Sequence, residues 1–325
     1  MIALTEPLLL MVVLFFIVPF AFIFIVMPYS IRRMGERGFV SRDMYKPDLP
    51  QVAINGGLIL LLVALFSISI LSLFYAQYVP IQNYAIISVV TLFAFFGLVD
   101  DMIGIGRIPK FLLLYYCSYP LIPFVPVIPL LIPFVGAVDL NVLYLQLIIP
   151  TFVPVVANLV NMHSGFNGLA PGLSLMILST LLLKTCFFGD IFNVLFILCL
   201  TGALAGYFFF ENYPARIFWG NVGALSIGAA IGATCVIQGF IVSGFVMLIP
   251  HTVNFLMWVY WNLNMKRVAY KKYGEVREDG TLQVPNRLTL KWVLPSYFRM
   301  TEVQATVAMF GLTGLFCIAG FFIPG

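Results

Sequence analysis

Charge is scarce in this chain, and its scarcity excludes most soluble folds. Only 9% of the 325 residues are Asp, Glu, Lys or Arg, whereas 62% are hydrophobic. A soluble domain of this length needs far more polar surface to face water. The apolar runs also lack the alternation of a membrane β-strand. Because only helices and closed barrels satisfy their own backbone in lipid, the composition predicts an all-α integral membrane bundle.

Cysteine and histidine are also sparse. The five cysteines lie singly in apolar stretches, and neither they nor the two histidines have the close spacing of a zinc or redox motif. We therefore interpret the cysteines as small hydrophobic packing residues. Nothing in the sequence points to a nucleic-acid partner.

Apolar runs of about 20 residues are long enough to cross a bilayer as helices. Cutting the chain where charge, Pro or Gly interrupts these runs gives about ten predicted transmembrane helices. We place them near residues 7–28, 54–75, 83–99, 111–134, 142–161, 169–186, 191–210, 219–237, 240–262 and 302–323. Residues 1–325 then form a single transmembrane domain with a basic inner loop at 263–301.

The Lys and Arg residues predict how this bundle is oriented. If the N-terminus is outside, sixteen of the 17 fall in inner loops, and only Lys184 falls outside. Such an excess of basic residues is typical of cytoplasmic loops. With about ten helices, both termini are predicted on the outer side.

Two adjacent carboxylates, Asp100 and Asp101, follow the third predicted helix on the inner side, and Lys110 lies nine residues beyond Asp101. Neighbouring carboxylates repel unless a cation, a proton or a lysine compensates them. Divalent-metal or phosphate chemistry is a natural use of such a pair. The alternative is a solvated pair that nearby basic residues neutralise.

Two other inner segments collect polar side chains in an otherwise apolar chain. One is the loop that holds Asn158, Asn161, His163 and Asn167, and the other is the turn at Gly220–Asn221, which opens a helix of small residues. Amide side chains can bind a metal, a base edge or sugar hydroxyls. A helix start that faces water also favours anions.

A transporter or channel is the main alternative from another functional class. Its intramembrane polar groups would line a path across the bilayer. The predicted spans are nearly free of ionisable residues, however, and the polar residues gather on one face. An enzyme that acts on a membrane lipid needs only that face.

Taken in order, four motifs resemble the polyprenyl-phosphate N-acetylhexosamine-1-phosphate transferases. The chain is most similar to the branch that uses UDP-GlcNAc and dolichyl phosphate, in a compact, archaeal-type form. The resemblance runs from about Ser41 to the last helix, and it implies ten helices with an inner-face site. The motifs are Asp100–Asp101 with Lys110, the segment 158–169, the segment 218–221, and the segment 250–255.

The resemblance implies transfer of GlcNAc-1-phosphate from UDP-GlcNAc to a polyprenyl or dolichyl phosphate. The products would be UMP and GlcNAc-pyrophosphoryl-lipid, which starts N-glycan assembly. The implied cofactor is Mg²⁺, or Mn²⁺ in its place. The implied location is a membrane, with the site on the cytosolic face: the plasma membrane of a prokaryote or the endoplasmic reticulum of a eukaryote. Another UDP-sugar donor stays open, and a homodimer is expected by analogy alone.

The resemblance also implies roles for single residues. Asp100 matches the carboxylate that acts on the acceptor phosphate, and Asp101 matches its neighbour near the metal. Lys110 matches a phosphate-binding lysine. Asn161 matches a residue at the Mg²⁺, and Asn167 matches one that reads the uracil.

Four more positions are assigned in the same way. Arg42 and Met44 match the first inner loop, where pyrophosphate and base bind, and Arg267 is the assigned substrate contact in the basic loop. Asn221 stands where the family has an Asp that binds Mg²⁺. An Asn keeps an oxygen ligand but removes a full negative charge, so we expect weaker Mg²⁺ binding.

Overall fold

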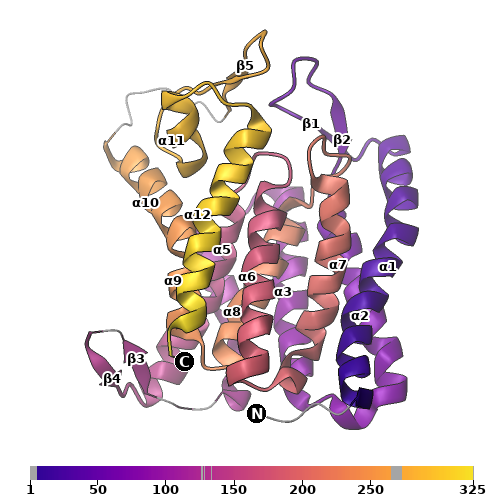
Figure 1. Ribbon diagram of the computed structural model, residues 1–325, viewed down its shortest axis with the longest axis vertical. Coiled ribbons are helices and arrows are strands. Elements are labelled where there is room, and N and C mark those ends of the chain that lie inside the picture. Colours follow the sequence, from indigo (N-terminus) through magenta and orange to yellow (C-terminus); the bar gives the residue numbers. More distant parts are fainter. Residues whose placement is uncertain (1–5, 126, 128, 133, 265–272, 325) are drawn as a thin grey trace.

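The computed structural model describes residues 6–324, apart from 126, 128, 133 and 265–272, and its helices run roughly side by side in one bundle (Figure 1). The long helices are α1 (Glu6–Glu36), α2 (Gly56–Tyr75), α3 (Ile81–Ile103), α5 (Ile149–Met162), α6 (Leu169–Phe188), α7 (Leu195–Glu211), α8 (Gly220–Ile237), α10 (Ile249–Asn264) and α12 (Glu302–Phe322). The shorter ones are α4 (Arg107–Cys117), α9 (Ile241–Met247) and α11 (Leu290–Tyr297). The 3-10 helices η1 (Ala76–Tyr78), η2 (Tyr119–Phe124) and η4 (Ile191–Val194), and the π-helix η3 (Tyr144–Ile148), are shorter still.

Three short antiparallel hairpins complete the described fold. They pair β1 (Val40–Arg42) with β2 (Gln51–Ala53), β3 (Leu130–Ile132) with β4 (Gly136–Val138), and β5 (Glu275–Val276) with β6 (Leu282–Gln283). The predicted all-α membrane bundle is confirmed. Within the described residues, eight helical segments are long and apolar enough to cross a membrane, or nine if one bent pair counts as a span.

The predicted continuous helix at 111–134 is wrong. Only its first part is helical, in α4 and then in the tight helix η2, and β3 follows. Prolines at 120, 123, 126, 129 and 133 explain the break, because proline removes a helical N–H and clashes with the preceding turn. The predicted span 240–262 is also interrupted, since α9 and α10 meet at an angle of 63°.

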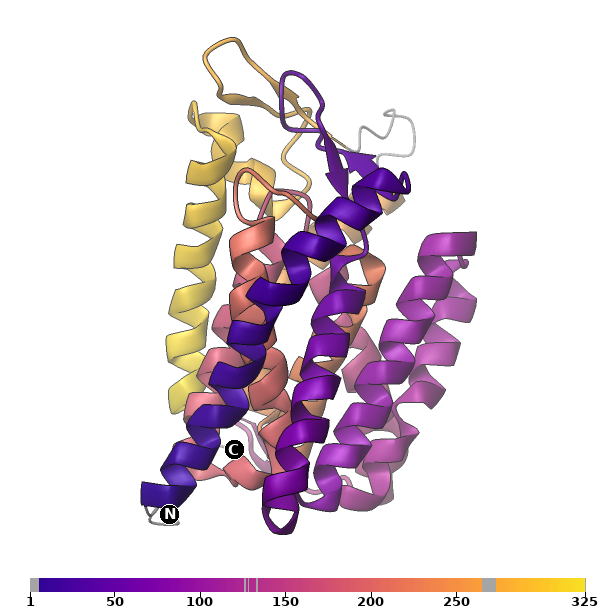
Figure 2. The ribbon, with the colours of Figure 1, turned by 90° about the vertical axis from the view of Figure 1, so that its right-hand side faces the viewer.

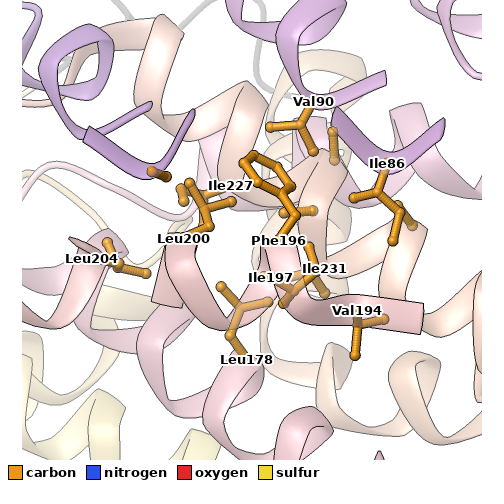
Figure 3. Packing of buried hydrophobic residues seen from close by; sticks show 14 of the residues in the cluster. Ile86, Val90, Leu178, Val194, Phe196, Ile197, Leu200, Leu204, Ile227 and Ile231 are labelled. Atoms are coloured by element: carbon orange, nitrogen blue, oxygen red, sulfur yellow. The ribbon is translucent and has the colours of Figure 1, made fainter. Parts of the chain in front are cut away.

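Helix α8 forms the centre of the bundle, and each of its residues from Val222 to Ile237 is buried. It packs against α3 and α5, and more lightly against α2, α6 and α9. Figure 3 shows aliphatic side chains of α8 meeting those of neighbouring helices; these are Ile227 and Ile231 of α8, with Ile86, Val90, Leu178 and Leu200. Glycine lets the backbones approach closely: a Cβ on Gly228 would lie 2.5 Å from Ala157 Cα.

The two ends of the bundle differ in character. One end carries the hairpins β1–β2 and β5–β6 with α11, and we call it the polar end (Figures 1 and 2). The start of α1, the end of α12 and the hairpin β3–β4 lie at the opposite end, which we call the terminal end. This arrangement agrees with a threading that puts both termini on one side.

Lys184, the single cation outside the predicted inner loops, has a structural role at the terminal end. Its side chain is buried, and its Nζ donates to the carbonyl oxygens of Phe321 (3.0 Å), Gly320 (3.5 Å) and Ile323. These are carbonyls at the end of α12, which have no partner within the helix and carry its partial negative charge. Lys184 therefore caps the last helix.

We expect Lys184→Met to destabilise the protein, because the terminal carbonyls of α12 would lose their donor. Each buried acceptor left without a partner costs about 1–3 kcal/mol. The measurement is the melting temperature in detergent, with the exposed Asp139→Ala at the same end as the control. A melting temperature equal to that of the wild type would show that α12 ends stably without this cap.

Candidate functional site

Three helices bring polar side chains together at the polar end. Asp100 lies near the end of α3, Lys110 in the first turn of α4 and Asn221 in the first turn of α8. Lys110 Nζ lies 2.7 Å from Asp100 Oδ2, and Asn221 Nδ2 donates to the same oxygen at 3.0 Å. The carboxylate of Asp100 is therefore shared with Asn221, 121 positions away in the sequence. We call Asp100, Asp101, Lys110 and Asn221 the carboxylate cluster.

A tight turn after α3 positions Lys110 beside Asp100. Gly104 ends α3 in the left-handed conformation, with φ 65°, which glycine adopts without strain. Its N–H donates to the carbonyl of Asp100 at 2.9 Å, and the N–H of Ile105 donates to Asp100 Oδ1, also at 2.9 Å. Helix α4 therefore starts only a few residues later and turns its lysine back to the cluster.

Asp101 faces the start of α8 and is more open to solvent than Asp100. Its Oδ2 accepts the backbone N–H of Asn221 at 3.0 Å. The first N–H groups of a helix have no internal partner and carry partial positive charge, so they stabilise a carboxylate. The start of α8 thus offsets part of the charge of the Asp pair.

Two glycines allow α3 and α8 to approach at this point. A Cβ on Gly97 would lie 2.6 Å from the carbonyl oxygen of Asn221, so only glycine fits there. Gly220 has φ 69°, and a Cβ on it would meet Asp101 Oδ2 at 2.9 Å and Asn55 Oδ1 at 3.0 Å. The two backbones can therefore approach closely only because both positions are glycine.

A groove of about 680 Å³ opens beside the cluster, between α4, α5, α9 and α10. Lys110, Asn158 and Asn161 provide its polar part. The rest of the lining is mainly apolar and includes Phe152, Val155, Val156, Phe245, Leu248, Phe255 and Leu256. Asn161 thus faces the same groove as Lys110, as the sequence-based site requires.

A second pocket of about 270 Å³ lies on the far side of Met162, beneath α11. Aromatic and polar side chains line it, among them Trp258, Trp261, Tyr273, Thr289, Lys291 and Trp292. Asn254 fixes this wall, since its Nδ2 donates to the carbonyl of Met162 and its Oδ1 accepts from Thr289 Oγ1 at 2.8 Å. Asn254 is therefore a structural bridge between α10, α5 and the start of α11.

The two histidines pack against each other in the wall beside this pocket. The rings of His163 and His251 meet edge to face, with centroids 4.6 Å apart, and both are buried. Burial, together with the nearby His251 and Lys291, holds the pKa of His163 well below its ordinary value. His163 is therefore neutral near pH 7 and serves as a packing group.

Asn167 lies in a separate network beside the loop between β1 and β2. Its Oδ1 accepts from Lys46 Nζ at 3.0 Å and from the N–H of Ala215 at 2.9 Å. Lys46 also pairs with Glu302 at 2.6 Å and with Asp43 at 3.1 Å. This buried network joins the β1–β2 loop, the start of α6, the loop before α8 and the start of α12.

Three predicted substrate-binding residues remain: Arg42, Met44 and Arg267. Arg42 lies exposed on β1, and Met44 is half-buried in the loop that follows. Neither makes a described contact with the carboxylate cluster. Arg267 lies outside the described residues.

Several residues that hold the site were not predicted from sequence. Glu211, buried at the end of α7, accepts from the N–H of Trp219 at 2.9 Å and from Tyr207 Oη at 2.6 Å. It fixes the turn that presents Asn221. The only signal for it was a lone carboxylate at the end of an apolar helix. Glu302 lies at a predictable helix start, since Thr301 and Gln304 form a capping box, but nothing in the sequence pairs it with Lys46.

The donor set fits Mg²⁺ only in part. No group of three or more His, Cys, Asp or Glu side chains able to hold a metal occurs in the described part of the chain. Among the predicted site residues, the oxygens that could bind a cation are those of the Asp101 carboxylate and the amide oxygens of Asn161 and Asn221. Mg²⁺ commonly uses one or two carboxylates together with waters and substrate phosphates. These residues therefore suit a cation that is shared with a bound phosphate.

The structure is thus a membrane bundle with a carboxylate cluster at the mouth of an apolar groove. Residues 83–239 match glycosyl transferase family 4. The chain is 30% identical over 312 residues to a protein of Saccharolobus solfataricus, with 93% of each chain covered. That protein carries the provisional name UDP-N-acetylglucosamine–dolichyl-phosphate N-acetylglucosaminephosphotransferase. The chain belongs to glycosyl transferase family 4.

Two other relatives show how far the similarity extends. A Sulfolobus acidocaldarius protein with the same provisional name is 28% identical over 298 residues, with 87% of each chain covered. A phospho-N-acetylmuramoyl-pentapeptide-transferase of Clostridium kluyveri is 38% identical over 99 residues, about 30% of this chain and 31% of its own. The similarity to the archaeal proteins thus covers most of the chain, whereas the bacterial one is local.

We expect Lys46→Met to lower stability, because Asp43 and Glu302 would be left buried without their cation. Breaking a buried ion pair costs roughly 3–5 kcal/mol. Thermal unfolding in detergent measures the loss, and Asp48→Ala, an exposed carboxylate in the same loop, is the matched control. If both variants melt together with the wild type, Lys46 does not hold the network.

Proposed function

We propose that this protein transfers GlcNAc-1-phosphate from UDP-GlcNAc to a polyprenyl or dolichyl phosphate. The products are GlcNAc-pyrophosphoryl-lipid and UMP. The reaction takes place at the polar end, on the cytosolic face of the membrane, and supplies the first lipid-linked sugar for N-glycosylation. The archaeal relatives support this choice, because their names give the same donor and the same acceptor lipid.

The proposal rests on one observation: a single groove is polar at one end and apolar along the rest of its lining. Lys110, Asn158 and Asn161 give it a polar end beside the carboxylate cluster, and the remaining lining is apolar. A polyprenyl phosphate has the same division, with a charged head and a hydrocarbon chain. A groove between membrane helices also lets such a lipid enter sideways from the bilayer.

The chemistry is a phosphoryl transfer between two anions. An oxygen of the acceptor phosphate attacks the β-phosphorus of UDP-GlcNAc, and the bond from that phosphorus to the bridging oxygen breaks. UMP leaves with the electron pair of that bond. Such reactions depend mainly on positioning and on neutralising charge, so the protein must hold both anions close together.

Within this scheme, Lys110 neutralises the acceptor phosphate at the mouth of the groove, and Asp100 holds Lys110 in place. Asp101 and Asn161 are the residues that would hold Mg²⁺. When bound, Mg²⁺ supplies positive charge that draws the two phosphates together. The first loop, with Arg42 and Met44, contacts the nucleotide, and Arg267 contacts the donor.

The direct test is transfer of radiolabel by the purified protein. UDP-[³H]GlcNAc, polyprenyl phosphate and Mg²⁺ should yield label in the organic phase, with release of UMP. Tunicamycin, a nucleotide-sugar mimic, should block the transfer. A panel of other UDP-sugars tests the donor, and preference for another sugar would replace GlcNAc in the proposal. Solute uptake by proteoliposomes with no labelled lipid would favour a transporter instead.

Asp100→Asn and Lys110→Ala should each lower the transfer rate by at least about 100-fold, because the charge balance at the reacting phosphates is lost. Melting temperature and elution profile check that the variants remain folded. The control is Asp139→Ala, an exposed carboxylate at the terminal end. Near-normal rates in both variants would exclude the cluster as the reaction site.

Val155→Trp should raise the KM for the lipid acceptor several-fold and leave the KM for UDP-GlcNAc unchanged. Val155 lies in the apolar lining of the groove and is 38% exposed, so a larger ring would occupy space that the lipid needs. Leu183→Trp, on α6 and away from the groove, is the matched control. An unchanged lipid KM would show that the acceptor binds elsewhere.

A further inference from the structure

The carboxylate of Asp100 is held by three donors from three parts of the chain. Oδ2 receives Lys110 Nζ at 2.7 Å and Asn221 Nδ2 at 3.0 Å, and Oδ1 receives the N–H of Ile105 at 2.9 Å. The side chains of Asp100 and Lys110 are only 9% and 13% exposed. Asp100 is therefore fixed in position by the protein itself.

Asn221 is linked to both members of the Asp pair. Its side chain donates to Asp100, and its backbone N–H donates to Asp101 at 3.0 Å. An amide that lies 3.0 Å from a carboxylate oxygen has to present its NH₂ group, because its oxygen would be repelled. The orientation of the Asn221 amide therefore follows from its neighbour.

An aspartate at 221 could not make this contact. It has no hydrogen to donate when ionised, so two carboxylates would meet at about the same distance and compete for Lys110. The backbone cannot retreat to relieve them, since the carbonyl of Asn221 packs on Gly97 and Gly220 forms the turn before it. A bound cation would then be needed in addition to Lys110 to hold the two carboxylates together.

We infer that Asn221 is a positioning residue, which sets the Asp100–Asp101 pair by hydrogen bonding and makes its geometry independent of a bound cation. Among the side chains that the structure describes, the charges that face this pair are those of the pair itself and of Lys110, which gives one cation for two carboxylates. The inference rests on the proposed function only where a transfer rate is read. The other readout is thermal stability.

The first experiment compares melting temperatures in EDTA and in millimolar Mg²⁺, in detergent. The wild type should melt at the same temperature in both. Asn221→Asp should melt at least about 3 °C below the wild type in EDTA and recover in Mg²⁺. An Asn221→Asp protein as stable as the wild type in EDTA would overturn the inference, and so would a wild type that Mg²⁺ strongly stabilises.

The exchanged variant, Asp100→Asn with Asn221→Asp, provides the matched control. The oxygen of the new amide at 100 can accept from Ile105, and its NH₂ can donate to the carboxylate at 221. We expect the EDTA sensitivity of Asn221→Asp to disappear in this variant. If the sensitivity persists, or if the exchanged protein is the less stable of the two, the carboxylate–amide match is not what stabilises the pair.

Asn221→Ala tests the positioning role in the reaction. It should lower kcat at least tenfold, while the KM for UDP-GlcNAc and the Mg²⁺ concentration for half-maximal rate stay as in the wild type. A raised Mg²⁺ requirement would identify Asn221 as a metal ligand and overturn the inference. A wild type with no transferase activity would remove the proposed function, whereas the melting data would still decide the role of Asn221.

Discussion

The contact between α3 and α8 is the interaction on which the site depends. Gly97 lets the two backbones meet at Asn221, and this approach brings the end of one helix against the start of the other. The carboxylate of Asp101 then accepts a free N–H of α8, and the carboxylate of Asp100 accepts the side chain of Asn221. Without that packing, Asp100 and Asp101 would be two repelling charges at a membrane boundary, and Lys110 alone could not hold both.

The sequence was sufficient for the membrane bundle and for most helix positions, because hydrophobic length decides both. It failed at 111–134, where apolar composition was weighed above five prolines. Backbone geometry decides that segment, and the proline rule would have ended the helix in the right region. The bend between α9 and α10 has a similar signal, since Pro250 is the second residue of α10 and proline is tolerated in the first turn of a helix but not in its interior.

The candidate site could be predicted only as a set of residues. Asp100, Asp101, Lys110 and Asn221 were selected from sequence, and the structure brings them into contact. Their pairing could not be predicted, because it depends on which atoms face each other after α3, α4 and α8 have packed. The network around Lys46 was missed for the same reason, since its partners are distant in sequence and each looks ordinary alone. Asn167, expected to read a base, has its oxygen occupied by Lys46 and Ala215.

The link between Lys46 and Glu302 joins positions 256 residues apart. A ribosome makes the first inner loop long before it makes the final membrane helix, so Lys46 and Asp43 must remain in water until Glu302 has been synthesised. Only the arrival of α12 lets them be buried together. The order of membrane insertion thus makes the last helix the step that completes the polar end, and a chain that stops before it would expose unmatched charge to quality control.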